Sequence, residues 1–600
     1  MTSTNRALAR IFKEMAGIYE FSGQGDRFRV LAYQKAARVL GSLEEDVSKY
    51  VSNNQLEDLP GIGESIAEKI REYLETGKIA KYEALKTTVP HELLEMLDIK
   101  GFGPQSLKQI SAALGIHTRE GIVKALQDGS IGRLKGFGQK KVENMMKGLK
   151  LHKTLEERML LWDALELGEV IVGRLRQLPE VKKAELAGSL RRGRETIGDI
   201  DILVAAEDRH RKKIMDFFTG WANIGQVLAR GDTKVSAIIK DHLRQVDIRL
   251  VHQDEWGAAL QYFTGSKEHN VHLRSIAKDK GLKISEYGVF RIKDNKRIAG
   301  ENEEDMYRAL DFRWMPPEMR EDRGELELAA RHKIPELITL DDIRGDLQMH
   351  TDWSDGMHTI EEVARYVKKN LPYRYIALTD HSKASRIAKG MDEKQFLEQL
   401  KAIREVNEKL GEDFVKSGAE VDILPDGTLD LSDEVLGQLD IVVGSIHSAF
   451  SRDNTDRIIK ACENPHVAII GHPTGRLIGT REAYPVDMRR VIEAAADTGT
   501  ALEINAQPNR MDLNDDWARL AREKGVKLVI STDMHQLSNF NFMKLGILVA
   551  RRAWCTAGDI LNTGKWKDVQ AFVERKRKGV GVVAKRSKLL SWFPSYGAID

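Results

Sequence analysis

GSLRRGRETIGDID, residues 188–201, is the stretch that decides the fold of the middle of the chain. Asp199 and Asp201 are separated by one residue on a predicted strand, so both carboxylates project from one face. A third carboxylate, Asp247, lies in QVDIRL on another predicted strand. Three converging carboxylates repel one another unless cations hold them, and two magnesium ions about 3.5–4 Å apart are the usual arrangement for in-line phosphoryl transfer. The pattern predicts a two-metal site on a sheet.

The same stretch also carries phosphate-binding groups. Gly188 and Ser189 begin a turn, and Arg191 and Arg192 follow directly. Their N–H, hydroxyl and guanidinium groups are the donors that a triphosphate requires. Two nearby aspartates alone would also fit a surface turn or a calcium loop. The combined arrangement predicts a metal-dependent nucleotidyltransferase.

Short apolar strands surround this stretch within residues 151–256, separated by helical segments. Residues 257–315 form a smaller mixed unit. Residues 316–340 carry three prolines among charged residues, a composition typical of a linker. The predicted strands of the larger unit are AELAGSL, GDIDILVAA, VSAIIK and RQVDIRLV.

Residues 1–150 are predicted to be almost entirely helical, because apolar residues recur three and four positions apart. One feature occurs three times: an apolar residue, then Gly-x-Gly, then an amphipathic helix. Such hairpins place the N–H groups of a helix start where a phosphate can sit, and glycine permits the close approach. Three copies favour helix–hairpin–helix contacts with a nucleic-acid backbone over ordinary loops. The copies are LPGIGESIAEKI (59–70), IKGFGPQSLKQI (99–110) and LKGFGQKKVENM (134–145), with Gly61, Gly63, Gly101, Gly103, Gly136 and Gly138.

From residue 341 onward, strands and helices alternate, which predicts a parallel sheet or barrel with functional residues at the strand C-terminal ends. Histidines gather in this part of the chain, most of them at or just after a predicted strand. Imidazoles and carboxylates at the ends of different strands predict a polynuclear site for zinc, manganese or iron. Adjacent metals would activate water and neutralise a phosphodiester. The histidines are His350, His358, His381, His447, His466, His472 and His535.

Composition limits the class of protein. With 600 residues, 42% hydrophobic and 31% charged, the chain is expected to fold into several domains. Two cysteines, Cys462 and Cys555, exclude a disulfide scaffold and a cysteine-rich zinc module. No run of 18 apolar residues exists, and the N-terminal sequence lacks the apolar core of a signal peptide. We expect a cytoplasmic protein that acts as a monomer and has no membrane partner.

Residues 1–315 resemble the family X DNA polymerases, the group that includes DNA polymerase beta. GSLRRG and GDIDIL match the palm motif of that family, YFTGS at 262–266 matches its thumb motif, and SKEHNVHLR follows at the same spacing. The resemblance implies that Asp199, Asp201 and Asp247 are catalytic and bind Mg²⁺ or Mn²⁺ in the palm. It implies that a deoxynucleoside triphosphate is held by Gly188, Ser189, Arg192, Gly198, Tyr262, Phe263, Gly265 and Asn270. It assigns Arg274 and the six hairpin glycines to gapped or primed DNA.

LPGIGESIAEKI also resembles the lyase-domain hairpin of the family, and Lys69 falls at its Schiff-base lysine. A lysine nucleophile needs a lowered pKa, obtained from burial or nearby cations, for which Lys35 and Arg71 are candidates. Two interpretations stay open: Lys69 is catalytic in a 5′-deoxyribose-phosphate lyase, or it only contacts phosphate. Ser65 replaces a lysine of the polymerase beta hairpin, so we expect a weaker 5′-phosphate pocket.

Residues from about 340 to 575 resemble the polymerase and histidinol phosphatase (PHP) domain, a distorted barrel of about seven strand–helix units. One departure is clear: the usual His-x-His reads Gln348-x-His350. An amide oxygen binds a soft or borderline divalent ion weakly, so one metal position is expected to differ. His358 and His466 match no ligand motif. The resemblance implies two or three Mn²⁺ or Zn²⁺ ions on His350, Asp355, His381, Glu420, His447, His472, Asp533 and His535.

The expected architecture is a multidomain chain with an all-α helix–hairpin–helix N-terminal region, an α+β nucleotidyltransferase palm and thumb, and a C-terminal distorted α/β (βα)7 barrel. The expected domains are a lyase-like domain with the first hairpin (1–85), a fingers-like domain with further hairpins (86–150), a palm (151–256), a thumb (257–315), a linker (316–340), a PHP phosphoesterase domain (341–575) and a basic tail (576–600).

Bacterial and archaeal family X polymerases have this layout, and in them the PHP domain carries 3′–5′ exonuclease and sometimes abasic-site endonuclease activity. The leading hypothesis is therefore a DNA-repair polymerase that fills short gaps and trims 3′ ends. Three alternatives stay open: a polymerase with a structural PHP domain, a PHP nuclease whose palm only holds DNA, and a non-catalytic damage-binding scaffold. The intact aspartates and YFTGS argue against the second, and Gln348 favours the first.

Overall fold

The structure is a computed structural model that describes residues 3–579, apart from 23–26, 44–45, 54, 60, 87–88, 100 and 242. The tail expected at 576–600 therefore lies mostly outside the described residues. The chain divides into two compact units, one of residues 1–157 with 479–482 and one of 158–478 with 483–600. None of the described helices is both long enough and apolar enough to cross a membrane.

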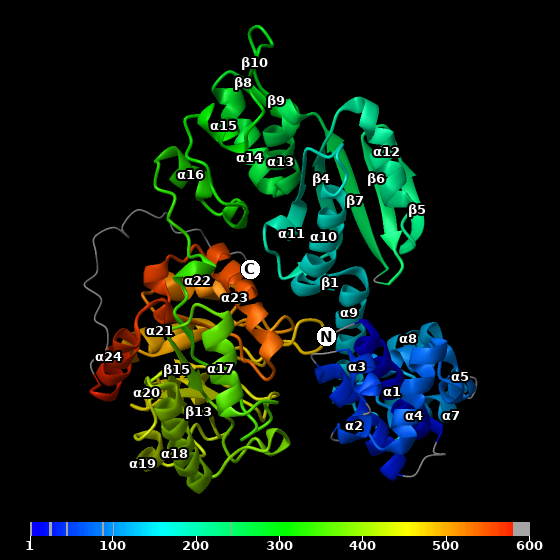
Figure 1. Cartoon of the computed structure of the whole chain (residues 1–600), viewed down its shortest axis with the longest axis vertical. Helices are drawn as coiled ribbons and strands as arrows, with labels where there is room; N and C mark the ends of the chain where they lie inside the picture. The colour runs from blue at the N-terminus through cyan, green and yellow to red at the C-terminus, as the bar shows by residue number, and fades with distance from the viewer. Residues whose placement is uncertain are drawn as a thin grey trace. The chain divides into compact units, whose positions relative to one another are not determined.

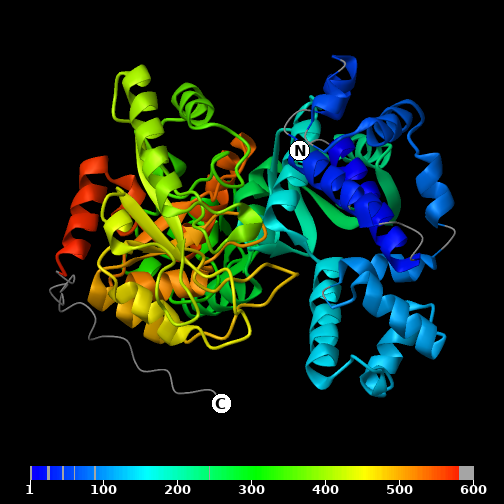
Figure 2. The same ribbon diagram turned by 90° about the horizontal axis from the view of Figure 1, so that it is seen from below.

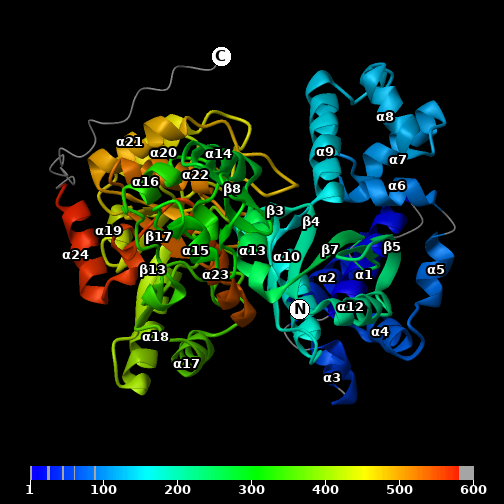
Figure 3. The ribbon, with the colours of Figure 1, turned by 90° about the horizontal axis from the view of Figure 1, so that it is seen from above.

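The N-terminal unit is helical, as expected, and has two separate hydrophobic clusters. The first cluster is formed by residues between Leu8 and Leu94, and the second by residues between Leu93 and Met145. Figure 3 shows α7, α8 and α9 grouped together, and their residues contribute to the second cluster. The helices are α1 (Ser3–Ser22), α2 (Arg27–Ser42), α3 (Val47–Ser52), α4 (Glu64–Thr76), α5 (Ala80–Lys86), α6 (His91–Glu95), α7 (Pro104–Leu114), α8 (Arg119–Gln127) and α9 (Gln139–Glu157).

The three Gly-x-Gly copies adopt the same backbone conformation. The first glycine of each has a positive φ: 99° at Gly61, 98° at Gly101 and 86° at Gly136. A side chain would strain this conformation, which explains the glycine. The turns close with equivalent bonds, from Ile62 N to Leu59 O, from Phe102 N to Ile99 O and from Phe137 N to Leu134 O, each 3.0 Å long.

The second glycine of each copy directly precedes a helix. Gly63 caps α4, Gly103 caps α7, and Gly138 lies immediately before α9. No heavy atom would lie within 4 Å of a Cβ at any of these three positions. Each helix start is therefore open to a phosphate oxygen, as a helix–hairpin–helix contact requires.

The palm is a five-stranded mixed sheet in the order β2-β4-β7-β6-β5 (Figure 1). Only β4 and β7 pair in parallel, and their register sets Asp201 directly opposite Asp247. The elements are β1 (Met159–Leu160), α10 (Leu161–Arg176), β2 (Lys183–Leu186), α11 (Gly188–Arg191), β3 (Thr196–Ile197), β4 (Asp199–Ala205), α12 (Asp208–Thr219), β5 (Ile224–Arg230), β6 (Lys234–Ile239) and β7 (Arg244–Val251).

Alternation along β4 separates the palm core from the functional face. Ile202 and Val204 lie in the cluster that includes α10 and α12 residues. Leu203 and Ala205 pack instead with α13 (Trp256–Thr264). Asp201 shares the parity of Leu203, so the aspartates project on the α13 side of the sheet.

The thumb follows directly from α13. It contains α14 (Lys267–Asp279), an antiparallel sheet of β8 (Leu282–Ser285), β9 (Gly288–Arg291) and β10 (Arg297–Ala299), and α15 (Glu303–Arg308). The segment 316–340, expected as a linker, packs against this part of the chain. It contains α16 (Glu325–Ala330), and the side chains of Arg320 and Glu325 are fully buried.

The C-terminal region is a seven-stranded parallel sheet in sequential order, β11 to β17, wrapped by helices (Figure 2). Met349 and Met534 form a parallel bridge that joins the ends of the first and last strands. The expected distorted barrel is confirmed. Its strands are β11 (Gly345–Asp346), β12 (Tyr375–Leu378), β13 (Val415–Asp422), β14 (Ile441–Ser445), β15 (Ile469–Ile470), β16 (Ala501–Asn505) and β17 (Leu528–Ser531).

Strand residues of the barrel alternate between two hydrophobic clusters. Ile376 and Leu378 belong to the large cluster, whereas Tyr375 and Ala377 pack with residues of the last helix. Burial on both faces accounts for the continuous apolar runs seen in the sequence. The helices are α17 (Ile360–Asn370), α18 (Glu393–Leu410), α19 (Asp433–Leu436), α20 (Thr455–Glu463), α21 (Met488–Thr498), α22 (Asp515–Glu523), α23 (Met543–Arg552) and α24 (Trp566–Arg577).

Candidate active sites

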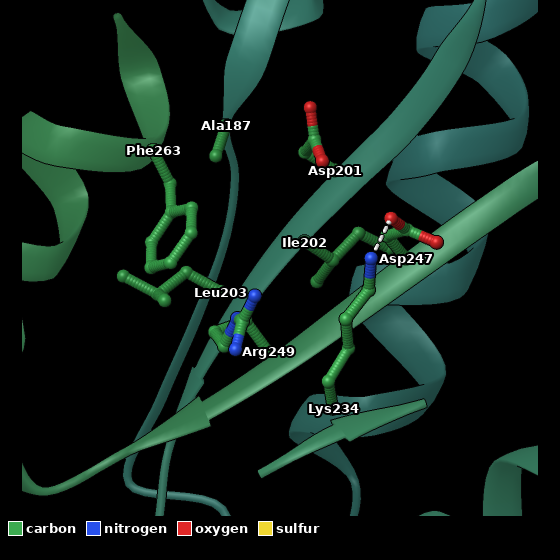
Figure 4. Close-up of a pocket in the computed structure, with 8 residues that line it drawn as sticks. All are labelled: Ala187, Asp201, Ile202, Leu203, Lys234, Asp247, Arg249 and Phe263. Atoms are coloured by element: carbon green, nitrogen blue, oxygen red, sulfur yellow. Dashed lines mark ion pairs between the residues drawn. The ribbon is translucent and has the colours of Figure 1, made fainter. Parts of the chain in front are cut away.

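The palm brings the three expected aspartates together. The carboxylates of Asp199, Asp201 and Asp247 lie within 4.8 Å of one another. Figure 4 shows Asp201 and Asp247 facing the same pocket, with Phe263 on its other side. Lys234 on β6 forms an ion pair with Asp247, Nζ to Oδ2, at 2.5 Å.

The positive charge near this cluster does not balance its three carboxylates. Burial and the charges of Asp199 and Asp247 raise the pKa of Asp201 to about 7. Burial would also raise the pKa of Asp247, but hydrogen bonds from Lys234 and its neighbours lower it below its usual value. Carboxylate oxygens are the ligands that Mg²⁺ and Mn²⁺ prefer, so the residues fit these ions.

Gly188 allows the phosphate-binding turn to approach the aspartates. Its φ is +60°, and a Cβ there would lie 2.1 Å from Asp201 Oδ2. The Ala187 amide donates to the Asp201 carbonyl at 2.8 Å, which fixes the turn to β4. Any larger residue at 188 would collide with the Asp201 carboxylate.

Residues expected to bind a nucleotide converge on this turn from α13 and α14. Arg192 donates from Nη1 to the carbonyl oxygen of Thr264, next to Gly265. Tyr262 and Phe263 make an edge-to-face pair with centroids 5.1 Å apart. Asn270 is buried and donates to the Tyr262 carbonyl at 2.8 Å.

Two expected contacts lie at the edges of this region. Gly198 lies beside Arg158, whose Nη1 would be 3.2 Å from a Cβ at 198. Arg274 is exposed on α14. Its expected contact with the template is an intermolecular one, and it stays a prediction.

Lys69 lies on α4, directly after the first hairpin. Its ammonium donates to Ser65 O at 2.7 Å and Ser65 Oγ at 2.9 Å. Burial lowers the pKa of Lys69, which favours the neutral amine.

The cations that act on Lys69 differ from those expected. Lys81 and Arg29 contribute to the lowered pKa of Lys69. Arg71 instead forms an ion pair with Glu57 at 2.6 Å, and Lys35 lies over Gly61. The positions of Lys81 and Arg29 near Lys69 depend on the packing of the helices, so the sequence alone did not reveal them.

The barrel gathers its histidines and carboxylates at the C-terminal ends of the strands. They form three overlapping groups, each with ligand atoms within 4.8 Å of one another. The groups are His350–Asp355–His381–His535, His381–Glu420–His447 and His350–Glu420–Asp533. Glu420, almost completely buried on β13, belongs to two of them. His472 contacts the same carboxylate, with Nε2 at 2.9 Å from Oε1.

The barrel ligands have strongly divergent proton affinities. Burial alone would lower the pKa of His447, but Glu420 and Asp422 raise it to about 10. Burial lowers the pKa of His381 to about 4. Metal ions compete with protons for such groups, and this mixed nitrogen and oxygen donor set fits Mn²⁺ or Zn²⁺.

Backbone strain marks two of these positions. His472 has φ of 27° and Asp533 has φ of 50°, values that non-glycine residues seldom adopt. Such strain persists where the surrounding structure over-determines it, commonly at ligand-binding positions.

Gln348 stands where the PHP resemblance implies a histidine, and its Oε1 would lie 3.3 Å from a Cβ at Gly471, the residue before His472. It is fully buried, and neither Nε2 nor Oε1 has a hydrogen-bond partner among the described residues. A buried amide without hydrogen-bond partners costs free energy. The Gln348 amide is therefore suited to bind a metal ion or a water molecule. His358 and His466 are half-buried and belong to none of the three groups.

Sequence reasoning missed several residues that support the barrel site. Asp422 lies 3.2 Å from His447 Nδ1, and Asn505 donates to Asp533 Oδ2 at 3.0 Å, so both orient candidate ligands. Arg510 lies 3.7 Å from Asp533, and its Nη1 has no hydrogen-bond partner within the part of the chain that the structure describes. Asp422 and Asn505 were detectable, since each ends a strand beside a ligand, but Arg510 lies in a loop and gave no signal.

A cavity of about 370 Å³ opens over the barrel ligands. Arg510 and Arg386 line it, together with the fully exposed Ile387. The volume lies at the small end of the range for ligand pockets, about 300–1,000 Å³. Cationic groups above a metal-binding cluster suit a phosphodiester.

The fold and the two clusters define a nucleotidyltransferase joined to a metal-dependent phosphoesterase barrel. The family described as DNA polymerase beta thumb matches residues 259–321, a helix-hairpin-helix domain family matches 3–79, and a SAM-like helix-hairpin-helix tandem family matches 93–151.

One known protein matches the chain over almost its whole length, and two others match part of it. The DNA polymerase/3′-5′ exonuclease PolX of Bacillus subtilis (strain 168) is 38% identical over 573 residues, which cover 95% of this chain and 99% of that protein. DNA polymerase lambda of Rattus norvegicus is 29% identical over 286 residues, 45% of this chain and 46% of that protein. A probable phosphatase of Thermoanaerobacter sp. (strain X514) is 33% identical over 249 residues, 39% of this chain and 96% of that protein. The chain belongs to the family X DNA polymerases that carry a C-terminal PHP domain.

Proposed function

We propose that the chain is a DNA-repair polymerase that fills short gaps from the palm and trims 3′ ends in the PHP barrel. The observation that carries this proposal is the presence of two separate clusters of candidate metal ligands in one chain. One cluster contains the aspartates of β4 and β7, and the other contains the ligands around Glu420. Because each cluster has its own pocket, each can bind its own substrate and catalyse its own reaction.

In the palm, Asp199, Asp201 and Asp247 would hold Mg²⁺ or Mn²⁺. Such ions supply charge neutralisation to the α-phosphate and lower the pKa of the primer 3′-hydroxyl. The chain supplies the remaining orientation. The turn at Ser189 and Arg192 holds the triphosphate, and the paired rings of Tyr262 and Phe263 lie along the sugar and exclude a 2′-hydroxyl.

The DNA is held by groups that do not read sequence. The open helix starts after Gly63, Gly103 and Gly138 donate N–H groups to backbone phosphates on both sides of a gap. Arg274 on the exposed face of α14 contacts the template. Binding is therefore expected to weaken steeply as salt concentration rises.

In the barrel, the eight expected ligands would hold two or three Mn²⁺ or Zn²⁺ ions. Such ions activate water for attack on a phosphodiester. Arg510 and Arg386 place the scissile phosphate over Glu420, and Asp422 keeps the His447 ring in orientation. The same site supports 3′–5′ exonuclease and abasic-site endonuclease chemistry, since both cleave a phosphodiester.

The lowered pKa of Lys69 favours a third activity, a 5′-deoxyribose-phosphate lyase. The Lys69 amine would attack the aldehyde C1′ of an incised abasic site, release water and form an imine. All three activities belong to the repair of DNA in the cytoplasm. All residues of each proposed site come from one chain, so we propose that the protein acts as a monomer.

A one-nucleotide gapped duplex with a 5′-labelled primer tests the two main activities together. With Mn²⁺ and the complementary deoxynucleotide, we expect the primer to lengthen by one. Without the nucleotide, we expect it to shorten. Lengthening alone would make the barrel a structural domain, and shortening alone would make the palm a DNA-holding module.

A further inference from the structure

A buried chain of alternating charges joins the triphosphate-binding turn of the palm to the barrel. Arg192 Nε contacts Glu321 Oε1 at 3.1 Å. Arg552, the last residue of α23 in the barrel, contacts the same Glu321 oxygen at 2.8 Å through Nη1. The other end of Arg552, Nη2, contacts Asp515 Oδ2 at 2.8 Å, at the start of α22.

Arg552 also bonds the palm backbone directly. Its Nη1 donates to the carbonyl oxygen of Arg192 at 2.9 Å. One guanidinium from the barrel therefore fixes both the main chain of Arg192 and the carboxylate that holds the Arg192 side chain. Since Arg192 uses Nε and Nη1 for Glu321 and Thr264, these contacts leave Nη2 for a ligand.

Water has little access to this chain of charges. The side chains of Arg192, Glu321 and Arg552 are 13%, 11% and 3% exposed. Burial would raise the pKa of Glu321, but Arg552 and Arg192 hold it below its usual value. Low exposure strengthens each attraction and makes the loss of one partner costly.

The surrounding surfaces are packed, so the contact is not an isolated surface ion pair. Trp162 of α10 meets Phe542 edge to face, with centroids 4.9 Å apart. Lys544 lies 4.4 Å above the Trp162 ring. A Cβ at Gly193, directly after Arg192, would lie 3.2 Å from Leu548 of α23.

We propose that Arg552 of the PHP barrel is a positioning residue for nucleotide addition in the palm. It acts through Arg192 and Glu321, and it presents the Arg192 guanidinium in one orientation toward the incoming triphosphate. The barrel thereby contributes to the affinity for nucleotide without touching it. This inference rests on the proposed role of Arg192 in triphosphate binding.

Removal of the Arg552 guanidinium should weaken nucleotide binding more than chemistry. In R552A, Glu321 loses a cation and the Arg192 carbonyl loses its donor, so Arg192 leaves its fixed orientation. We expect the KM for the deoxynucleotide to rise about tenfold with kcat within about twofold, since the lost contact acts in the ground state and the transition state alike.

The neighbouring Arg551 offers a matched control. It lies on the same helix, is partly buried, and joins the barrel to the 316–340 segment through Glu318 at 2.7 Å and the Ile338 carbonyl at 2.9 Å. None of its contacts in the described part of the chain is with Arg192. R551A should therefore cost a comparable amount of stability while leaving the KM for nucleotide unchanged.

The experiment compares full-length wild type, R551A, R552A, R552K and R192A in single-nucleotide gap filling at fixed Mn²⁺. Exonuclease activity on a single-stranded oligonucleotide reports that each barrel is folded. R552K retains the charge but cannot make three bonds in a planar fork, so we expect its KM to lie between those of wild type and R552A. If R552A does not fold, R552K takes its place in the comparison.

The outcomes distinguish the role of Arg552 from the triphosphate-binding role of Arg192. A rise in KM for R192A and R552A, but not for R551A, supports the inference. A rise for R192A with R552A and R552K equal to R551A would overturn it. An unchanged KM for R192A would instead refute the proposed triphosphate site, whatever Arg552 does.

Discussion

Asp201 and Asp247 lie directly opposite each other in the parallel ladder between β4 and β7, and their pKa values shift in opposite directions. Burial and two neighbouring carboxylates raise the pKa of Asp201 to about 7. Bonds from Lys234, Ser236 and Gln245 outweigh burial at Asp247 and lower its pKa. The uncompensated charge thus centres on Asp201, which is the position that a divalent cation would stabilise most.

Replacement of Asp199 and Asp201 by alanine should abolish primer extension and leave trimming intact. The two changes remove two of the three proposed ligands of the palm ions, so we expect about a 10³-fold loss of extension, the upper end of what removal of charge stabilisation from an active site costs. Primer extension and 3′ trimming, measured on the same substrate, check this. A parallel loss of trimming in folded protein would contradict the assignment of two sites.

Replacement of His350 and His447 by alanine should have the reverse effect. These changes remove ligands from all three barrel groups, and the expected outcome is loss of trimming together with a lower content of Mn²⁺ or Zn²⁺. Elemental analysis of the purified protein measures the metal content. Extension serves as the control, and a variant that keeps its metal and still trims would refute the ligand set.

Q348H should make the barrel hold its metal more firmly. Gln348 is buried, and its amide atoms have no partner in the described ranges, so an imidazole there would supply a nitrogen ligand in place of a weak amide oxygen. We expect slower loss of metal during dialysis against a chelator. If Q348H and wild type lose metal at the same rate, residue 348 is not part of the metal site.

E303Q should destabilise the palm and thumb in a way that depends on pH. Burial would raise the pKa of Glu303, but Arg320 and Arg191 lower it well below its usual value. A depressed folded pKa stabilises the protein at neutral pH, and this contribution is lost as pH falls below about 4.3, the value for an unfolded glutamate.

The loss continues as pH falls toward the folded pKa, so the difference in unfolding temperature between wild type and E303Q should be larger at pH 7 than at pH 3. Calorimetry measures it, and loss of one partner from a buried ion pair is expected to cost about 3–5 kcal/mol at pH 7. E304Q is the control, because Glu304 is exposed on the same helix. A difference that stays constant with pH would contradict the ion-pair interpretation.

K69A should lose borohydride-dependent cross-linking to DNA that carries a 5′-deoxyribose phosphate. The reagent reduces the imine formed between Lys69 and the sugar aldehyde and makes the adduct permanent. K78A, an exposed lysine beyond the same helix, should cross-link as wild type does. Equal cross-linking by K69A would leave Lys69 with phosphate contact alone.

Local patterns predicted much of the fold. The alternation around Asp199 and Asp201 indicated β4, and the three Gly-x-Gly copies indicated hairpins whose φ values now agree within about 13°. The barrel strands were detectable because both of their faces are buried. By contrast β5 was missed, since most of its residues are exposed at the sheet edge and give no apolar alternation.

Long-range pairing was beyond sequence reasoning. The 316–340 segment has the prolines and charges of a linker, yet Arg320 is buried against Glu303 and Glu325 is bonded to His269. Charged residues are predicted to lie at the surface unless their partners are known, because charged side chains are seldom buried without one. For the same reason, nothing in the sequence connected Arg552 with Arg192, which lies in another domain.

The bridge between Met349 and Met534 has a consequence for how the protein is made. His350 lies near the first barrel strand and Asp533 just after the last, 183 positions further along the chain. A ribosome releases the palm and thumb long before it has synthesised Asp533 and His535. The barrel cluster thus becomes complete only after the palm and thumb have been synthesised, and a chain that ends before residue 533 lacks Asp533 and His535.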